Sequence, residues 1–176
     1  MTKYVLGGGC FWCLDAVYAQ LRGVSKVESG YAGGKGIPNY WRVVNGGTGH
    51  AEVVQVCFDE DVIPAEVILD IFFLIHDPTS LNKQGADEGT QYRSTMMYAD
   101  NDQKQAFESA LKRAEKIWDD PIVTEIVPLE TFYIAEPEHQ DYYNKNPDAG
   151  YCQIVIDPKI SKIRNQYKEW LKDIQK

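Results

Sequence analysis

The feature that most constrains the fold is an abrupt change of pattern over residues 3–21. A short apolar strand is expected at 3–6 (KYVL), three glycines follow at 7–9, and apolar residues then recur at positions 10, 14, 17 and 21. That spacing predicts one apolar face of a helix. Because glycine allows a sharp bend of the backbone, the chain is expected to pass directly from a strand into a helix that packs against it.

Strands and helices continue to alternate along the chain. Residues 51–58 (AEVVQVCF) form the clearest strand, with Val54, Val56 and Phe58 on one face. Pro64 is expected to open an apolar helix that runs to about Ile75, and 77–92 is expected to be a long polar loop. Further strands are expected at 24–30, 94–99, 123–128 and 152–156, the last at a sheet edge, and further helices at 102–118 and 161–174.

Several connections are too short for parallel crossovers, which favours antiparallel pairing. We therefore expect the α+β class: a two-layer sandwich of a mixed or antiparallel sheet with helices packed on it, a ferredoxin-like core, and a long irregular C-terminal segment. A length of 176 residues fits a single domain over 1–176.

The charge and the hydropathy pattern exclude several partners. A net charge of −8 argues against nucleic acid and against an anionic membrane surface. The most apolar run, 67–75, is too short to span a bilayer and contains Asp70. No secretory leader opens the sequence, so we expect a cytoplasmic location. We also expect the protein to be a monomer.

The sequence contains four cysteines, Cys10, Cys13, Cys57 and Cys152. Because the expected compartment is reducing, they are not expected to form structural disulfides. Metal binding, redox chemistry and simple burial are the open alternatives. A zinc site would need a second close pair of ligands, which the scattered histidines do not offer, so no metal is expected. Cys57 alternates onto the strand face opposite Glu52 and is interpreted as a packing residue.

Cys10 stands at the expected start of the first helix. The positive end of the helix dipole and the unpaired N–H groups there favour the thiolate form of a cysteine. Phe11 and Trp12 supply apolar walls suited to a small soft group such as a methyl thioether. Cys10 is therefore predicted to be a nucleophile, and the alternative is a buried structural cysteine among core aromatics.

Cys13 follows Cys10 at the spacing of dithiol redox motifs, one helical turn later. A bridge within that turn would have to draw together two Cβ atoms about 5–6 Å apart, to about 4 Å. Such a bridge is feasible but strained.

These segments resemble motifs of one family. GCFWC (9–13) is similar to the GCFWG signature of the peptide methionine sulfoxide reductases of the A type. GYAGG (30–34) leading to Tyr40, TGHAEVV (48–54), DEGTQYRS (87–94) and EPEHQDYY (136–143) match further motifs of that family in the family's order. The similarity covers nearly the whole chain.

The resemblance implies a role for each matching residue. Cys10 would attack the sulfoxide sulfur, Glu52 would be the acid, and Tyr40 and Tyr92 would help it bind and protonate the oxygen. Phe11 and Trp12 would hold the methyl group of the substrate. Asp87 would lie beside the site and orient its polar groups.

The residues themselves support Glu52 in part. It alternates onto the face that carries Val54, Val56 and Phe58, and apolar neighbours raise the pKa of a carboxyl so that it stays protonated near neutral pH. The alternative is a solvent-facing glutamate at a strand end. The two tyrosines could equally be packing residues among the eleven in the chain. The three histidines, His50, His76 and His139, are interpreted as structural hydrogen-bonding residues.

Attack by Cys10 would leave a sulfenic acid, which condenses with a nearby thiol. The resemblance implies the S epimer of methionine sulfoxide as substrate, free or in proteins, no bound cofactor, and thioredoxin as reductant, replaceable in vitro by dithiothreitol. Many relatives carry further cysteines in a glycine-rich tail, and this chain has none there. Cys152 occupies a site that some relatives without that tail use, and is favoured over Cys13 as the resolving thiol.

Two other classes remain open. One is a disulfide oxidoreductase that uses Cys10 and Cys13 as its dithiol and needs no acid at Glu52. The other is a non-catalytic module that only binds oxidised methionine, and that module would need neither Cys13 nor Cys152.

Overall fold

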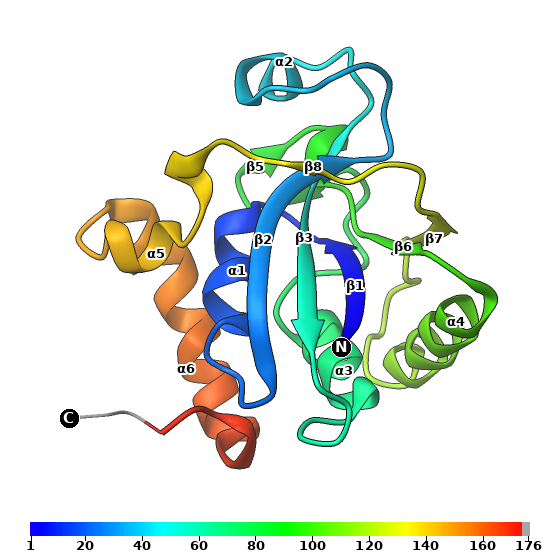
Figure 1. Ribbon diagram of the computed structural model, residues 1–176, viewed down its shortest axis with the longest axis vertical. Coiled ribbons are helices and arrows are strands. Elements are labelled where there is room, and N and C mark those ends of the chain that lie inside the picture. The colour runs from blue at the N-terminus through cyan, green and yellow to red at the C-terminus, as the bar shows by residue number, and fades with distance from the viewer. Residues whose placement is uncertain (174–176) are drawn as a thin grey trace.

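The computed structural model describes residues 1–173, which form a sheet with helices packed on one side of it (Figure 1). The strand order is β7-β6-β1-β3-β2-β8. The central strand β1 (Thr2–Gly7) is antiparallel to β3 (Ala51–Phe58) and to β6 (Thr95–Tyr98). β2 (Val24–Ala32) is antiparallel to β3 on its other side.

Two short strands complete the edges of this sheet. β7 (Glu125–Pro128) pairs with β6 in parallel, and β8 (Tyr133–Ile134) pairs with β2 in antiparallel fashion. In chain order β1, α1, β2, β3, α3 and β6 form a β-α-β-β-α-β unit with split crossovers. The expected mixed sheet with a ferredoxin-like core is therefore confirmed.

The first three of the main helices begin and end close to the expected residues, and the fourth begins and ends earlier than expected. They are α1 (Phe11–Tyr18), α3 (Ala65–Leu74), α4 (Asn101–Glu115) and α6 (Asp157–Gln166). Local chemistry fixes some of these ends: the Asp100 side chain accepts a hydrogen bond from the Gln103 N–H at the start of α4, and Lys112 and Arg113 lie in the last turn. Pro64 precedes the first residue of α3 as its N-cap.

Shorter elements fill the connections. They are α2 (Tyr40–Val44), β4 (Lys83–Gln84), β5 (Asp87–Glu88), α5 (Tyr142–Lys145) and the single turns η1 (Thr90–Tyr92), η2 (Pro137–His139), η3 (Cys152–Ile156) and η4 (Lys168–Trp170). The expected polar loop over 77–92 thus contains a small hairpin of β4 and β5.

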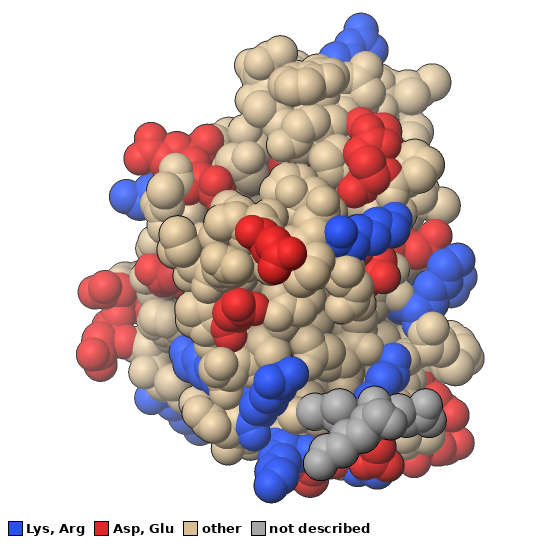
Figure 2. All heavy atoms as spheres, turned by 90° about the vertical axis from the view of Figure 1, so that its left-hand side faces the viewer, with Lys and Arg blue, Asp and Glu red and all other residues tan. Residues whose placement is uncertain are grey.

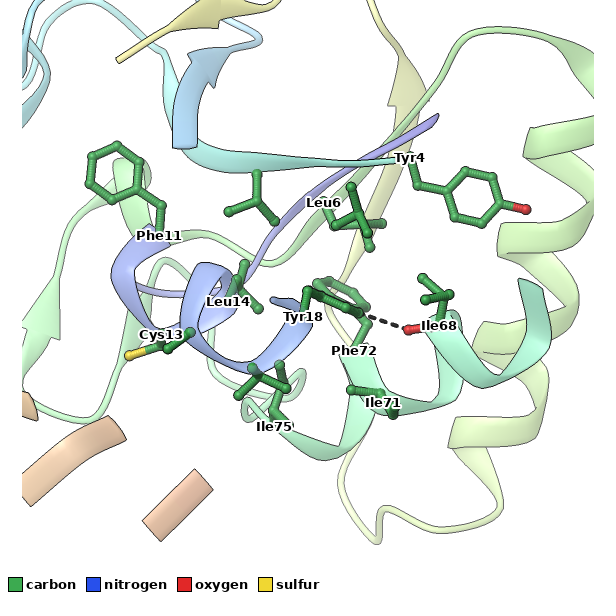
Figure 3. Packing of buried hydrophobic residues seen from close by; sticks show 14 of the residues in the cluster. Tyr4, Leu6, Phe11, Cys13, Leu14, Tyr18, Ile68, Ile71, Phe72 and Ile75 are labelled. Atoms are coloured by element: carbon green, nitrogen blue, oxygen red, sulfur yellow. Dashed lines mark hydrogen bonds between the residues drawn. The ribbon is translucent and has the colours of Figure 1, made fainter. Parts of the chain in front are cut away.

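The core lies between the sheet and the helices. Leu6 of β1 and Leu14 of α1 are fully buried together with Phe72 of α3 (Figure 3). The Tyr18 hydroxyl donates a 2.8 Å hydrogen bond to the Ile68 carbonyl and so ties α1 to α3 (Figure 3). A second, smaller cluster on the opposite face of the sheet holds Val53 and is covered by Phe132.

One expected strand is wrong. Residues 152–156 are helical, with the wide i→i+5 turn of a π-helix, and run directly into α6. The β-branched run IVI suggested an edge strand, but Cys152 and Ile156 instead bury themselves in the core cluster that includes α1. Tertiary burial of that helical face outweighs local β preference.

The C-terminal part of the chain returns to the end of α1. The Arg22 N–H donates to the Trp170 carbonyl at 2.7 Å, and Leu21 forms an isolated bridge with Leu171. The helix expected over 161–174 begins earlier and ends at Gln166, and its last expected residue, Ile174, lies outside the described residues.

The surface over α5 and α6 carries acidic and basic side chains with a broad uncharged area between them (Figure 2). Within residues 1–173, no helix combines the length and the hydropathy needed to cross a bilayer.

Candidate active site

The three glycines bring Cys10 to the start of α1. An added Cβ on Gly8 would lie 2.8 Å from the ring of His76, and Gly9 has a φ of +86°. The Gly9 N–H donates to the Tyr92 carbonyl at 3.2 Å, which holds this turn against η1. Cys10 is the N-cap residue of α1 and remains 8% exposed. Cys10 is thus placed at a helix start and is almost completely buried.

Glu52 lies on β3 and faces this turn. Its side chain is buried, and its Oε1 accepts a 3.2 Å hydrogen bond from the Phe11 N–H. Burial, with a smaller contribution from the charge of Asp87, raises the pKa of the Glu52 carboxyl to about 8, against the lowering effect of its hydrogen bonds to Phe11 and Cys10. The carboxyl therefore carries a proton at neutral pH, as strand alternation and its apolar neighbours predicted.

The expected depression of the Cys10 pKa is wrong. Burial first, and then the neighbouring Glu52 and Cys13, raise the pKa of the Cys10 thiol well above its usual range. The nearby Trp12 N–H and Tyr151 hydroxyl act to lower this pKa, but burial outweighs them. The helix start supplies a donor for the thiolate, yet the resting site holds a neutral thiol beside a neutral acid.

Tyr40 and Tyr92 approach the same pair of residues. Both side chains are half-buried, Tyr40 at the start of α2 and Tyr92 at the end of η1. Burial, and then Glu52 and Cys10, raise the pKa of Tyr40 to about 12. Burial, and then Glu52, Asp87 and Cys10, also raise the pKa of Tyr92. The two phenols keep their protons and are hydrogen-bond donors beside Glu52.

Phe11 and Trp12 form an aromatic layer with His139. Phe11 is fully buried, with its ring centroid 5.4 Å from that of His139. Trp12 stacks on Tyr142 at 3.7 Å, and its Nε1 donates to His139 Nδ1 at 3.1 Å. His139 is therefore a neutral acceptor, and burial lowers its pKa. Its structural interpretation fits these contacts.

Glu136 is a residue of the site that the sequence did not reveal as such. Its two carboxylate oxygens accept 3.0 Å hydrogen bonds from the Tyr31 hydroxyl and from the Tyr40 N–H. Glu136 thus fixes the start of α2 and with it the position of the Tyr40 phenol. Its place in the EPEH segment was the available signal.

Three residues with metal-ligating side chains meet at this corner of the site. Ligand atoms of Glu136, Glu138 and His139 lie within 4.8 Å of one another. Both Glu136 oxygens and Nδ1 of His139 already accept hydrogen bonds. Among the described residues, this group serves to position aromatic side chains.

The four cysteines are all buried thiols. Cys13 lies one turn after Cys10, and its N–H donates to the Cys10 carbonyl at 3.1 Å. Its sulfur points away from the sheet and from Leu14 (Figure 3). Cys152 packs in the same core cluster as Cys10 and Cys13 from its position in η3. Cys57 is buried on β3.

Tyr151 closes the space beside the sulfurs and was not singled out from the sequence. Its hydroxyl donates a 2.8 Å hydrogen bond to Asp87 Oδ2 and lies 3.6 Å from the Cys13 sulfur. Its ring meets Trp12 edge-on, with the centroids 5.7 Å apart. Its position directly before Cys152 was the only sequence signal.

A cavity of about 510 Å³ opens beside Cys10. Asp87 and Tyr151 line it, with His76 and Lys159 farther along its walls. The predicted residues that do not line it are Glu52, Tyr40, Tyr92, Phe11, Trp12, Cys13 and Cys152. Cys10 thus lies between this cavity and a cluster of proton donors, an arrangement that suits attack by sulfur with proton delivery from another direction.

The family model for peptide methionine sulfoxide reductase matches residues 2–171. Peptide methionine sulfoxide reductase MsrA of Arthrobacter sp. (strain FB24) is 58% identical over 172 residues, which are 97% of this chain and 99% of the relative. MsrA of Psychrobacter sp. (strain PRwf-1) is 48% identical over 97% of this chain and 99% of its own.

Solved structures agree with these relatives. Reduced Mxr1 from Saccharomyces cerevisiae matches with a TM-score of 0.81 and 36% identity, over 86% of this chain and 88% of that one. Mxr1 in complex with Trx2 matches with a TM-score of 0.58 and 25% identity, over 80% and 84% of the two chains. On these grounds the chain belongs to the peptide methionine sulfoxide reductase family.

Proposed function

We propose that Cys10 and Glu52 carry out the reduction of methionine S-sulfoxide in this chain, which by its family is a thiol-dependent methionine sulfoxide reductase. The observation that carries the proposal is the pairing of Cys10, which lines an open cavity, with a buried carboxyl that is protonated at neutral pH. A sulfoxide oxygen is a poor leaving group until it receives a proton, and a positioned acid supplies one.

In the first step the Cys10 sulfur attacks the sulfoxide sulfur while Glu52 protonates the oxygen. This attack forms a bond between the two sulfurs. The protonated oxygen then moves as a hydroxyl group to the Cys10 sulfur, so that the S–O bond of the substrate and the new S–S bond both break. Methionine leaves in reduced form, and Cys10, oxidised by two electrons, is a sulfenic acid. The proton that the Cys10 thiol loses restores the proton of Glu52, so the pair keeps its charge. Tyr40 and Tyr92 donate hydrogen bonds to the same oxygen, and Phe11 and Trp12 hold the methyl group.

In the second step a thiol condenses with the sulfenic acid, which releases water and forms a disulfide. We assign this role to Cys152, with Cys13 as the alternative. Thioredoxin is the proposed reductant, since a relative has been crystallised with Trx2. Asp87 is proposed to orient the polar groups of the site. We further propose that the chain has no resident cofactor, is a monomer and is located in the cytoplasm.

The test uses oxidised N-acetyl-methionine amide with dithiothreitol. Only the S epimer should be consumed, and Cys10→Ser should abolish its consumption. Equal use of both epimers would contradict the assignment. A disulfide oxidoreductase would keep its activity when Glu52 is replaced by Gln, whereas a sulfoxide reductase would lose most of it.

A further inference from the structure

Tyr151 occupies the place where the proposed resolving thiol has to arrive. Its hydroxyl binds Asp87 at 2.8 Å and lies 3.6 Å from the Cys13 sulfur, and its ring lines the cavity beside Cys10. A phenol has one proton to give, and here the acceptor is a carboxylate, which makes the bond a strong one. The side chain therefore fastens its segment to the site.

Cys152, the next residue, points elsewhere. It is fully buried in the core cluster, while Tyr151 is half-buried against the site. Tyr151 lines the cavity beside Cys10, and Cys152 does not. A disulfide requires a sulfur–sulfur distance of about 2.05 Å. The segment that carries Tyr151 and Cys152 must therefore rearrange before a Cys10–Cys152 disulfide forms.

The segment that has to turn is the π-helix η3. π-Helical turns are rare, short and frequently found at functional sites. This one follows Gly150, which has open space around it, and ends just before Pro158, which has no N–H to offer to the preceding turn. Ile154 in the middle of the turn is 77% exposed. Cys152, Ile156 and Val155 pack against the core, and the Gln153 N–H donates to the Ala149 carbonyl at 3.1 Å. Tyr151 is the residue next to this turn that ties it to the site.

We infer that Tyr151 is a positioning residue that holds η3 closed while Cys10 is reduced and releases it after oxidation, so that Cys152 takes its place. This inference rests on the proposed function. Conversion of Cys10 to the sulfenic acid adds a hydroxyl group beside Tyr151, and that group competes for Asp87. Once η3 turns, the Cys152 sulfur attacks the Cys10 sulfur. The Cys10 S–O bond breaks, the S–S bond forms, and the hydroxyl leaves as water with the Cys152 proton.

The test is a single turnover with one equivalent of substrate and no reductant. Methionine release measures the first step, and mass spectrometry measures the fractions of Cys10 sulfenic acid, trapped with dimedone, and of each disulfide. In Tyr151→Phe the ring remains but the bond to Asp87 is lost. We expect the Cys10–Cys152 disulfide to form about tenfold faster than in the unsubstituted chain.

The matched control is Tyr98→Phe, which removes a phenol hydroxyl at the far end of β6. The rates of methionine release and of disulfide formation in this variant should stay within about twofold of those of the unsubstituted chain. A second measurement needs no substitution: amide hydrogen exchange of residues 152–156 should speed up in the oxidised protein. A merely structural tyrosine would alter stability but not the ratio of the two rates.

The outcomes separate the two proposals. If methionine is released but Tyr151→Phe leaves disulfide formation unchanged, or only a Cys10–Cys13 bridge forms, the switch is wrong and the reductase assignment stands. Unchanged exchange in 152–156 after oxidation would also overturn the switch. If no methionine is released from the S epimer, the reductase assignment itself fails.

Discussion

Glu52 shows how burial of a single carboxyl sets a pH dependence. Its pKa of about 8 means that the acid loses its proton as the pH rises through that value. We therefore expect the single-turnover rate of methionine release to fall above about pH 8. Glu52→Gln keeps the shape but has no proton to give, and the rate should drop by about 10²- to 10⁴-fold. Rapid-quench assays from pH 6 to 10 would measure both effects, and an alkaline decline that persists in the Gln variant would contradict this role.

The same raised pKa has a cost in stability. Between pH 4.5 and 8 the unfolded chain ionises Glu52 while the folded chain keeps it protonated, so the free energy of unfolding falls as the pH rises. Each pH unit in that range costs about 1.4 kcal/mol. Glu52→Gln, whose amide oxygen can still accept from the Phe11 N–H, should be more stable by about 3 kcal/mol at pH 7 and unchanged at pH 4. Urea denaturation at the two pH values tests this. An equal increase in the free energy of unfolding at both pH values would show that the effect comes from packing and not from ionisation.

Single residues also mark the limit of what the sequence could reveal. Strand alternation was enough to orient Glu52, because its period depends only on local geometry. The pKa of Cys10 could not be anticipated, since the burial that raises it comes from segments far along the chain. Tyr151 was missed for the same reason: its partner Asp87 is 64 residues away. Side chains that meet only through the fold carry no local pattern.

At the scale of elements, the glycine turn between β1 and α1 sets the position of the nucleophile. The His76 ring that faces Gly8 cannot move aside, because it is buried and its Nε2 is hydrogen-bonded to Ser94 Oγ at 2.7 Å. Gly8→Ala should cost about 1–3 kcal/mol, as overpacking does, and should lower the rate of methionine release by displacing Cys10. Thermal unfolding and single-turnover assays would measure the two losses.

The control for the glycine turn is Gly150→Ala, because an added Cβ there meets nothing within 4 Å. That variant should leave the Tm unchanged or raise it slightly, since alanine has the higher helix propensity. If Gly8→Ala were as stable as Gly150→Ala, the close contact with His76 would not constrain the turn.

Elements with a strong period were predictable, and short ones were not. The strand at 51–58 was located to the residue, because it is rich in β-branched residues and its apolar positions 54, 56 and 58 alternate as strands require. Two-residue strands such as β8 have too few residues to show any period. The 152–156 turn was assigned to the wrong class because three consecutive β-branched residues suggest a strand, while their environment against α1 selects a helix.

At the scale of the whole molecule, the fold buries the nucleophile more deeply than a protein reductant can reach. Cys10 is 8% exposed and opens into a cavity of about 510 Å³, large enough for a small dithiol but not for a folded domain. Electrons from thioredoxin therefore have to pass through a thiol on a segment that can move outward. The segment proposed for this role is η3, which carries Cys152 and the exposed Ile154.

The variant Cys152→Ser is expected to affect activity with thioredoxin and activity with dithiothreitol differently. Dithiothreitol enters the cavity and reduces the sulfenic acid directly, so activity with dithiothreitol should stay within about threefold of that of the unsubstituted chain. Activity with thioredoxin should fall at least about 100-fold, because no disulfide reaches the surface. Cys57→Ser, a buried thiol on β3, is the matched control and should leave both activities unchanged. Full activity of Cys152→Ser with thioredoxin would transfer the resolving role to Cys13, because a bridge within the first turn of α1 would then be the species that thioredoxin reduces.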